Sequence, residues 1–325
     1  MISTDGFLIA GTHPRPVSGG HTAPRKFLLE GTTDVFQVMP KTHRYGEAGP
    51  IPPSLGSRLL PALDALEQTV KQLGKHPTPE EADRSNVRRL IRVLLTLAET
   101  HRDSYPEKKF ERAARKLKQL ASAVGRFKDH GILEQEVASL FPGGEVPRKV
   151  RKRLDRSSDK VKSQFDKAFR EFRKEDLDSV VRVLSRPAPV EAAGPQEIQK
   201  EDRRRLSQRI SDLTESVDRV GLHNQDPLEF HASRKALRWL LLTTQSSDGL
   251  FGFPPRDVEG MSRVVNGLGV AQDKFIAWDW LEREGFDELA AVKKGQYGEL
   301  HDHELQGSAE FERSGALQRI RQAVA

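Results

Sequence analysis

The chain has 325 residues, of which 31% are charged, and a formal net charge of +6. It contains no cysteine, which excludes a disulfide framework and fits a reducing compartment. No apolar run is long enough to span a bilayer, and the N-terminus lacks the basic start and apolar core of a secretory signal. We therefore expect a soluble, cytoplasmic protein.

The first 52 residues differ in composition from the rest of the chain. They are rich in Gly, Pro, Thr and His, with one strand-like stretch at residues 26–39, and they predict an N-terminal extension or tail at residues 1–52. Helical periodicity then continues almost to the end. It predicts an all-α fold of two helical-bundle halves, residues 53–187 and 196–325, joined by a Pro-rich linker at residues 188–195.

In the first half, apolar residues recur at helical spacing in several segments. A start signal stands at Thr78, followed by Pro79 in the first turn and by Glu81, which completes a capping box. The pattern predicts helices over residues 53–73, from 78 through 97, 106–140, 147–173 and 175–184.

The second half repeats this character. A second capping box begins at Asp226, with Pro227 and Glu229 after it. The pattern predicts helices over residues 196–217, from 226 onward, 257–268, 270–284, and from 305 to the C-terminus.

Two ordered sequence matches relate the halves. The segment 88–95 aligns with 234–241 at an offset of 146, and the segment 124–129 aligns with 268–273 at an offset of 144. The same order and nearly the same offset predict an internal duplication with a pseudo-twofold relation between the halves, and at least nine helices beyond residue 52.

Basic residues form a stripe on each matching helix. A spacing of four residues places Arg84, Arg88 and Arg92 on one helix face. Like charges at that spacing destabilise a helix, and a bound polyanion would offset the cost. Arginine suits this role because its guanidinium binds phosphate oxygens in a bidentate way. The alternative is salt bridging to acids on neighbouring helices.

A third basic region lies between Pro147 and Lys174, with twelve Lys or Arg against four acidic residues. Such segregation of charge favours an acidic partner, although a solvated helix face is the plain alternative. The candidate phosphate contacts are Arg84, Arg88, Arg89 and Arg92 in the first half, His231, Arg234, Lys235 and Arg238 in the second, and Lys116, Lys128, Lys152 and Lys160 on adjacent helices.

Other chemistry has weak support. No phosphate-binding loop of the GxxxxGK[ST] type is present, and no Ser/His/Asp set stands out. His301 and His303 resemble a metal pair, but a spacing of two places them on different sides of a helix. Asp129 and Asp273 each follow a glycine by four residues and are expected to cap or to pair with basic neighbours. We predict no cofactor, no metal and no catalytic residue.

These basic and glycine-containing segments resemble the CHAD family, the conserved histidine α-helical domain. The resemblance covers about residues 53–320 and rests on two basic helices at 84–92 and 231–239, each followed by a segment like Leu268-Gly-Val-Ala-Gln-Asp273. It implies two helical bundles, a basic groove between them and binding of inorganic polyphosphate, including at polyphosphate granules. In this chain, Glu81 and Leu228 stand where the family has its histidines.

Two other functions remain open at this point. A nucleic-acid-binding helical protein is the first, although only three Trp and three Tyr are available for base stacking. A phosphatase or kinase is the second, and it lacks a recognisable metal or nucleotide site.

Overall fold

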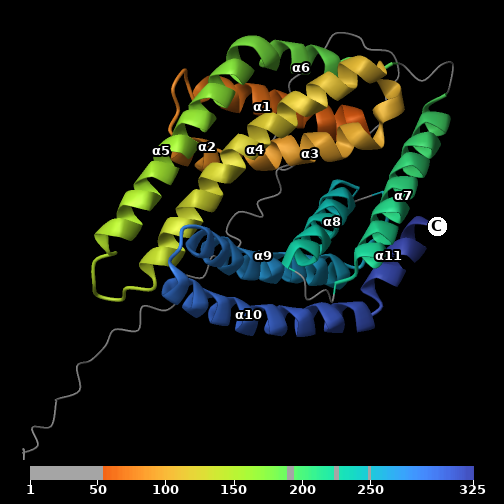
Figure 1. Cartoon of the computed structure of the whole chain (residues 1–325). Helices are drawn as coiled ribbons and strands as arrows, with labels where there is room; N and C mark the ends of the chain where they lie inside the picture. The colour runs from red at the N-terminus through yellow and green to blue at the C-terminus, as the bar shows by residue number, and fades with distance from the viewer. Residues whose placement is uncertain (1–53, 189–193, 223–226, 248–249) are drawn as a thin grey trace, which may run out of the picture. The chain divides into compact units, whose positions relative to one another are not determined.

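The computed structural model describes residues 54–188, 194–222, 227–247 and 250–325. All of these belong to one compact unit. The predicted N-terminal extension at 1–52, most of the linker at 188–195, and the Asp226 start of the second capping box lie outside the described residues. Within the described ranges every regular element is a helix and no strand occurs, which confirms the all-α prediction (Figure 1).

The first half follows the predicted order, except that the helix predicted from residue 78 through 97 is divided. Its long helices are α4, a single helix through Gly125, and α5, which runs antiparallel to α4 after a short loop (Figure 1). The elements are η1 (Leu55–Leu59), α1 (Leu60–Gln72), α2 (Pro79–Arg84), α3 (Val87–Thr100), η2 (Arg102–Ser104), α4 (Glu107–Ala138), α5 (Arg148–Glu171), η3 (Phe172–Asp176) and α6 (Leu177–Leu184).

The predicted helix from residue 78 through 97 is wrong, because two helices replace it. Thr78 and Glu81 do form the predicted capping box, and α2 then ends at Arg84. Asn86 adopts a left-handed conformation with φ of 60°, which breaks the helix before α3 begins at Val87. Arg84 therefore lies on a different helix from Arg88 and Arg92, and the stripe predicted from Arg84 to Arg92 begins at Arg88.

The second half differs more from prediction. The helices expected at 257–268 and 270–284 are one helix, α9, which continues through Gly269. The segment between 284 and 305, for which no helix was expected, belongs to α10, and Gly315 with φ of 72° then separates α10 from α11. The elements are α7 (Pro195–Val220), α8 (Pro227–Ser246), α9 (Pro255–Arg283), α10 (Asp287–Arg313) and α11 (Ala316–Val324).

The two halves meet mainly along two pairs of helices. Helix α3 packs against α8, and α4 packs against α9. An apolar cluster supports the second contact, with Val137 of α4 and Leu154 of α5 in the same group as Leu281 and Trp280 of α9. This packing holds α3 and α8 side by side with their basic residues near each other.

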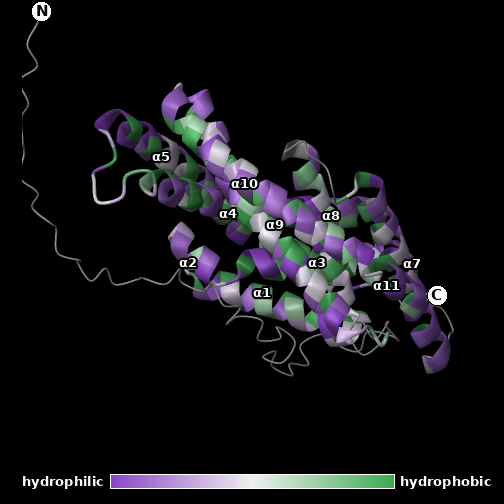
Figure 2. Cartoon of the chain, turned by 90° about the horizontal axis from the view of Figure 1, so that it is seen from below, coloured by the Kyte–Doolittle hydropathy of each residue, from purple (hydrophilic) through white to green (hydrophobic). Residues whose placement is uncertain are grey.

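The distribution of apolar and polar residues agrees with this helix packing. The outward side of α5 is hydrophilic, whereas Val150, Leu154, Phe165 and Phe169 are buried on its other side (Figure 2). Among the residues described, no helix is long and apolar enough to cross a membrane.

Candidate anion-binding site

Four arginines from the two halves lie together where α3 meets α8. Arg88 and Arg92 are one turn apart on α3, and Arg234 and Arg238 are one turn apart on α8. All four are half-buried, and their charges are close enough to affect one another. We call these four residues the arginine cluster.

A glycine on the neighbouring helix makes room for one arginine of each pair. The guanidinium carbon of Arg88 lies 2.8 Å from the point that a Cβ atom would occupy at Gly125 on α4. Similarly, Nη2 of Arg234 lies 2.7 Å from the corresponding point at Gly269 on α9. Only a residue without a side chain allows such close approach. The two matched segments thus make the same contact, although the predicted pseudo-twofold relation between the halves stays a prediction.

Two aspartates lie one helical turn beyond these glycines. Asp129 follows Gly125 on α4, Asp273 follows Gly269 on α9, and both are half-buried. The charge of Asp129 acts on Arg92, Arg234 and Arg238, and it also acts on Asp273. Four guanidinium groups and two carboxylates therefore share one partly buried region.

Burial and mutual repulsion disfavour the charged forms of the arginines in the cluster. Burial, followed by the charges of Arg88 and Arg234, lowers the pKa of Arg92 to about 10. Burial, followed by Arg234, Arg92 and Arg88, lowers the pKa of Arg238 to about 9. Burial is also the main cause that lowers the pKa of Arg234, even though Asp273 and Asp129 favour its charged form. Two carboxylates do not compensate four arginines.

Direct ion pairs do not relieve this excess. Within the part of the chain that the structure describes, no carboxylate oxygen lies within 4.0 Å of a nitrogen of the arginine cluster. The buried Nε of Arg234 also has no hydrogen-bond partner there. Salt bridging to neighbouring acids was the alternative explanation of the stripes, and these four arginines do not form it.

The other predicted contacts on α2, α3 and α8 lie around the cluster or apart from it. His231 is exposed, its Nδ1 lies 3.2 Å from Oε1 of Gln272, and burial of the ring with nearby Arg234, Lys235 and Arg238 lowers its pKa. Lys235 is exposed beside it. Arg89 is half-buried on α3, while Arg84 is exposed on α2 and donates to the backbone oxygen of Glu80.

The four secondary lysines do not form one set. Lys128 is exposed on α4 and acts on Asp273, so it borders the cluster. Lys116 instead pairs with Asp176 at 3.2 Å. Lys152 and Lys160 are exposed on α5, which packs against α4 and not against α3 or α8 among the principal helix contacts.

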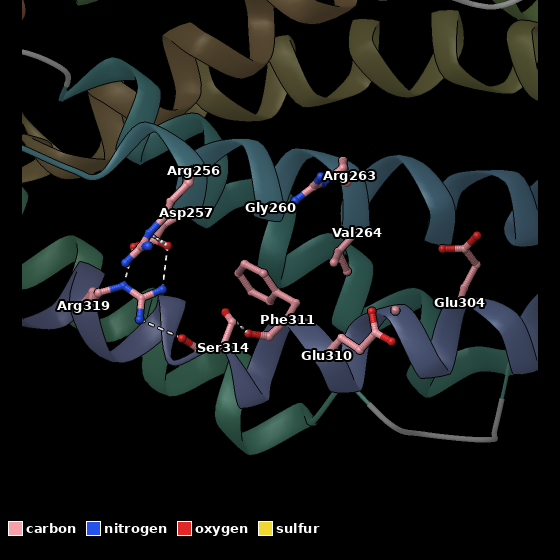
Figure 3. Close-up of a pocket in the computed structure, with 11 residues that line it drawn as sticks. Arg256, Asp257, Gly260, Arg263, Val264, Glu304, Glu310, Phe311, Ser314 and Arg319 are labelled. Atoms are coloured by element: carbon pink, nitrogen blue, oxygen red, sulfur yellow. Dashed lines mark hydrogen bonds and ion pairs between the residues drawn. The ribbon is translucent and has the colours of Figure 1, made fainter.

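A cavity of about 610 Å³ lies between α9, α10 and α11, with the ring of Phe311 facing into it (Figure 3). Nε and Nη2 of Arg319 donate to the two carboxylate oxygens of Asp257, at 2.9 and 2.7 Å. Glu304 and Glu310 also line this cavity. Three carboxylates therefore face three guanidinium groups, those of Arg256, Arg263 and Arg319. The cavity lacks the excess of positive charge that the arginine cluster has, so it suits a polyanion less well.

A Ser/His/Asp set exists in the structure but lacks the geometry of a catalytic triad. Both Oγ of Ser54 and Oδ1 of Asp202 contact the same nitrogen, Nε2 of His101, at 2.8 and 3.0 Å. A catalytic histidine instead uses its two nitrogens for different partners. All three side chains are buried, so the set links η1, the end of α3 and α7 away from solvent.

The two histidines that resembled a metal pair are separated as their spacing predicted. His301 is buried against the rings of Phe230 and Tyr297, whereas His303 is exposed. Among the described residues, no group of three or more His, Cys, Asp or Glu is placed to hold a metal ion.

The sequence drew attention to Asp129 and Asp273 but did not place them, or the glycine seats at Gly125 and Gly269, in the site. The aspartates were expected to cap a helix or to pair with basic neighbours; both instead lie inside long helices, near the arginines. The available signal was the Gly-x-x-x-Asp spacing, which places glycine and aspartate on one helix face. Spacing does not show that this face of α4 packs against α3, or that the matching face of α9 packs against α8, so their role could not be predicted.

One of three comparisons with known proteins found a match. The family model described as CHAD domain matches residues 63–282, which span α3, α4, α8 and all but the end of α9. Comparison with curated proteins found no match, and neither did comparison with solved structures. Because the family match covers more than half of the chain, the chain belongs to the CHAD domain family.

Proposed function

We propose, on the premise that the chain is a CHAD domain protein, that it binds inorganic polyphosphate through the arginine cluster and does not act on it as an enzyme. CHAD domains are polyphosphate-binding in general. In this chain Arg88, Arg92, Arg234 and Arg238 would contact the phosphates, with Lys128, His231 and Lys235 at the border.

The observation that carries the proposal is the set of four half-buried arginines without ion pairs to the described residues. A buried charge is costly unless it is paired and hydrogen-bonded. Phosphate oxygens would supply the missing acceptors in the bidentate geometry that guanidinium groups favour. A chain of phosphates could contact both pairs at once, because α3 and α8 come from different halves and lie side by side.

A nucleic acid is the competing ligand, and the exposed basic residues of α5 are the observation that favours it. Binding of single strands commonly uses aromatic side chains on which bases stack. Among the described residues, the three cation–π contacts involve Arg102, Arg203 and Lys294, and none involves the arginine cluster. The cluster therefore has the character of a phosphate site more than of a base-reading surface.

A competition titration tests the proposal. Labelled long-chain polyphosphate is bound to the full chain and displaced with unlabelled polyphosphate, single-stranded DNA or duplex DNA at equal phosphate concentration and equal salt. We expect polyphosphate to displace the label at the lowest concentration, with no release of free phosphate during incubation. Stronger displacement by either nucleic acid would contradict the proposal, and steady phosphate release would contradict its non-enzymatic part.

Salt provides a second test of the same mechanism. Neutralising several phosphates displaces counterions, so the affinity should fall steeply between low and physiological salt, in the same direction as for proteins that bind nucleic acids. An affinity that stays flat over this range would show that the arginines do not bind by charge.

A further inference from the structure

The acidic pair in the site, Asp129 and Asp273, does not help the arginine cluster to hold a polyanion. Asp129 and Asp273 lie on α4 and α9, which pack against each other, and each is one turn from a glycine seat of the arginine cluster. A carboxylate next to bound phosphate would repel it. Their presence in a site of this charge therefore needs an explanation.

We infer that Asp273, with Asp129 beside it, couples polyphosphate binding to the uptake of a proton, so that the site binds more tightly as the solution is acidified. This inference rests on the proposed function, since it concerns the same site and the same ligand. The proton comes from solvent, is held on the carboxylate of Asp273 while phosphate occupies the cluster, and returns to solvent on release.

The groups that face Asp273 explain why it is the acceptor. Arg234 on α8 and Lys128 on α4 favour its charged form, whereas Asp129 and Glu136 on α4 oppose it. Burial is the largest influence, and the net effect raises the pKa of Asp273 to about 6 in the free protein. No described residue forms an ion pair with either aspartate within 4.0 Å.

Glu136, the third carboxylate nearby, is not available for this purpose. Nζ of Lys274 lies 2.6 Å from it and Nζ of the buried Lys293 of α10 lies 2.7 Å from it. Although burial opposes its charge, these two lysines hold the pKa of Glu136 below its usual value. It therefore stays charged and adds to the field that disfavours a second charge at Asp273.

The sign of the effect follows from linkage. Negative phosphates placed beside Asp273 disfavour its charged form further, so its pKa in the complex lies above its pKa of about 6 in the free protein. Between these two pKa values the complex binds more protons than the free protein, and the affinity rises as pH falls through that window. Above the upper pKa and below the lower one, this contribution to the affinity does not change with pH. A protonated carboxyl group can also donate a hydrogen bond to a phosphate oxygen.

Calorimetry of the full chain with long-chain polyphosphate tests the inference directly. Titrations in two buffers of different ionisation enthalpy, repeated from about pH 7.5 to about pH 5.5, give the number of protons taken up on binding. We expect uptake by the wild-type chain between neutrality and about pH 6, and an affinity that gains about tenfold for each unit by which bound phosphate raises the pKa of Asp273. Long chains are used because only the terminal phosphates titrate in this range.

Variants separate Asp273 from other titrating groups. Asp273→Asn should bind more tightly than wild type near neutrality, with little proton uptake and a flatter pH profile. Asp279→Asn is the matched control, because it removes an aspartate of α9 that pairs with Arg283 at 2.7 Å, and it should keep the wild-type profile. Bound phosphate would also raise the lowered pKa of His231. Wild type and Asp273→Asn are therefore compared again with His231→Asn in both chains, where the remaining difference in proton uptake belongs to Asp273.

Asp129→Asn provides a second variant in case Asp273→Asn does not fold, and it should reduce the uptake because one of the repelling charges is lost. Equal proton uptake by wild type and Asp273→Asn would overturn the inference while the proposed function stands. Absence of polyphosphate binding by the wild-type chain at every pH would overturn the proposed function and the inference with it.

Discussion

The arginine cluster and the outer face of α5 are both basic, and they hold their charge in opposite ways. On α5 the basic residues are exposed, including Arg148, Arg151, Arg156 and Lys160. The exceptions with a partner are Arg153, which lies 3.4 Å from Glu284, and Lys167, which lies 4.0 Å from Glu171. In the cluster the arginines are fewer, half-buried and drawn from both halves of the chain.

This difference shows that the number of charges is a poor guide to a binding site. Water solvates the outer face of α5, so those residues cost little when no ligand is present. The arginine cluster has lost part of its water, and the lowered pKa values of Arg92 and Arg238 measure that cost. Bound phosphate would therefore offset a cost of burial in the arginine cluster that the outer face of α5 does not have.

The largest expected effect comes from removing two arginines from each region in turn. Arg92→Ala with Arg238→Ala removes one residue from each half of the cluster, and Arg151→Ala with Arg156→Ala removes the same charge from α5. Hydrogen bonds to charged groups contribute about 1.5–3 kcal/mol each, so the cluster variant should lose about a hundredfold or more in affinity for long polyphosphate. The α5 variant should lose about tenfold or less, measured by titration at the same salt.

Circular dichroism and thermal unfolding of both variants serve as the control for folding. If the two double variants weaken binding equally, net charge alone determines the affinity. The nucleic-acid alternative would then regain support, because a uniformly basic surface does not distinguish polyphosphate from other polyanions.

The spacing of basic residues in the sequence correctly predicted the two arginine pairs of the cluster but not the position of Arg84. The spacing of four residues does place Arg88 with Arg92 and Arg234 with Arg238, because both pairs lie within one helix. It was wrong for Arg84, since spacing alone cannot show that Asn86 adopts a left-handed conformation and ends the face. A spacing of four residues places two side chains on one face only if a single helix contains both residues.

The parts that could not be predicted depend on contacts between helices. The part of helix α10 before residue 305 was missed because its buried positions include Lys293 and His301, so its inner side has no continuous apolar stripe. Gly269 looked like a break, yet it lies within α9, where the absence of a side chain leaves room for the guanidinium group of Arg234. The arginines of the cluster are half-buried and the basic residues of α5 are exposed, and this difference also depends on how the helices pack.

A smaller effect on binding is expected from filling the glycine seats without changing any charge. Gly125→Ala and Gly269→Ala each place a methyl group within 3 Å of the guanidinium of Arg88 or Arg234, which must then move. The moved atoms are the far ends of flexible side chains, and alanine is favoured over glycine in a helix by about 1 kcal/mol. Folding should therefore be kept or improved, while affinity for polyphosphate falls roughly tenfold, as for one lost contact.

Gly131→Ala is the matched control for these variants, because it lies on the same helix as Gly125 and nothing lies within 4 Å of its added methyl group. It should gain similar stability and keep its affinity in the same titration. If Gly125→Ala and Gly131→Ala bind alike, the position of Arg88 against α4 is unimportant for the ligand.

The smallest expected effect concerns stability without ligand, and it compares the two regions at single positions. The pKa of Arg238 is lowered to about 9, chiefly by burial and then by three neighbouring arginines, so its charge at neutral pH destabilises the folded state. Arg238→Met keeps most of the apolar stem and removes that charge. It should raise the free energy of unfolding by about 1 kcal/mol, or Tm by roughly 2 °C, whereas Arg151→Met on α5 should change it by less than about 0.5 kcal/mol.

Added polyphosphate should reverse the order of the two Arg238 forms. A ligand that binds only the folded state raises Tm by an amount that grows with the logarithm of the ratio of its concentration to its Kd. At one polyphosphate concentration, wild type should therefore gain more than Arg238→Met, and Arg151→Met should gain nearly as much as wild type. This reversal would mean that the arginine cluster is held at a cost in stability that phosphate offsets, as expected of residues kept for binding. If Arg238→Met were instead less stable than wild type without ligand, the arginines would be held by interactions within the protein, and the contrast with α5 would lose its physical basis.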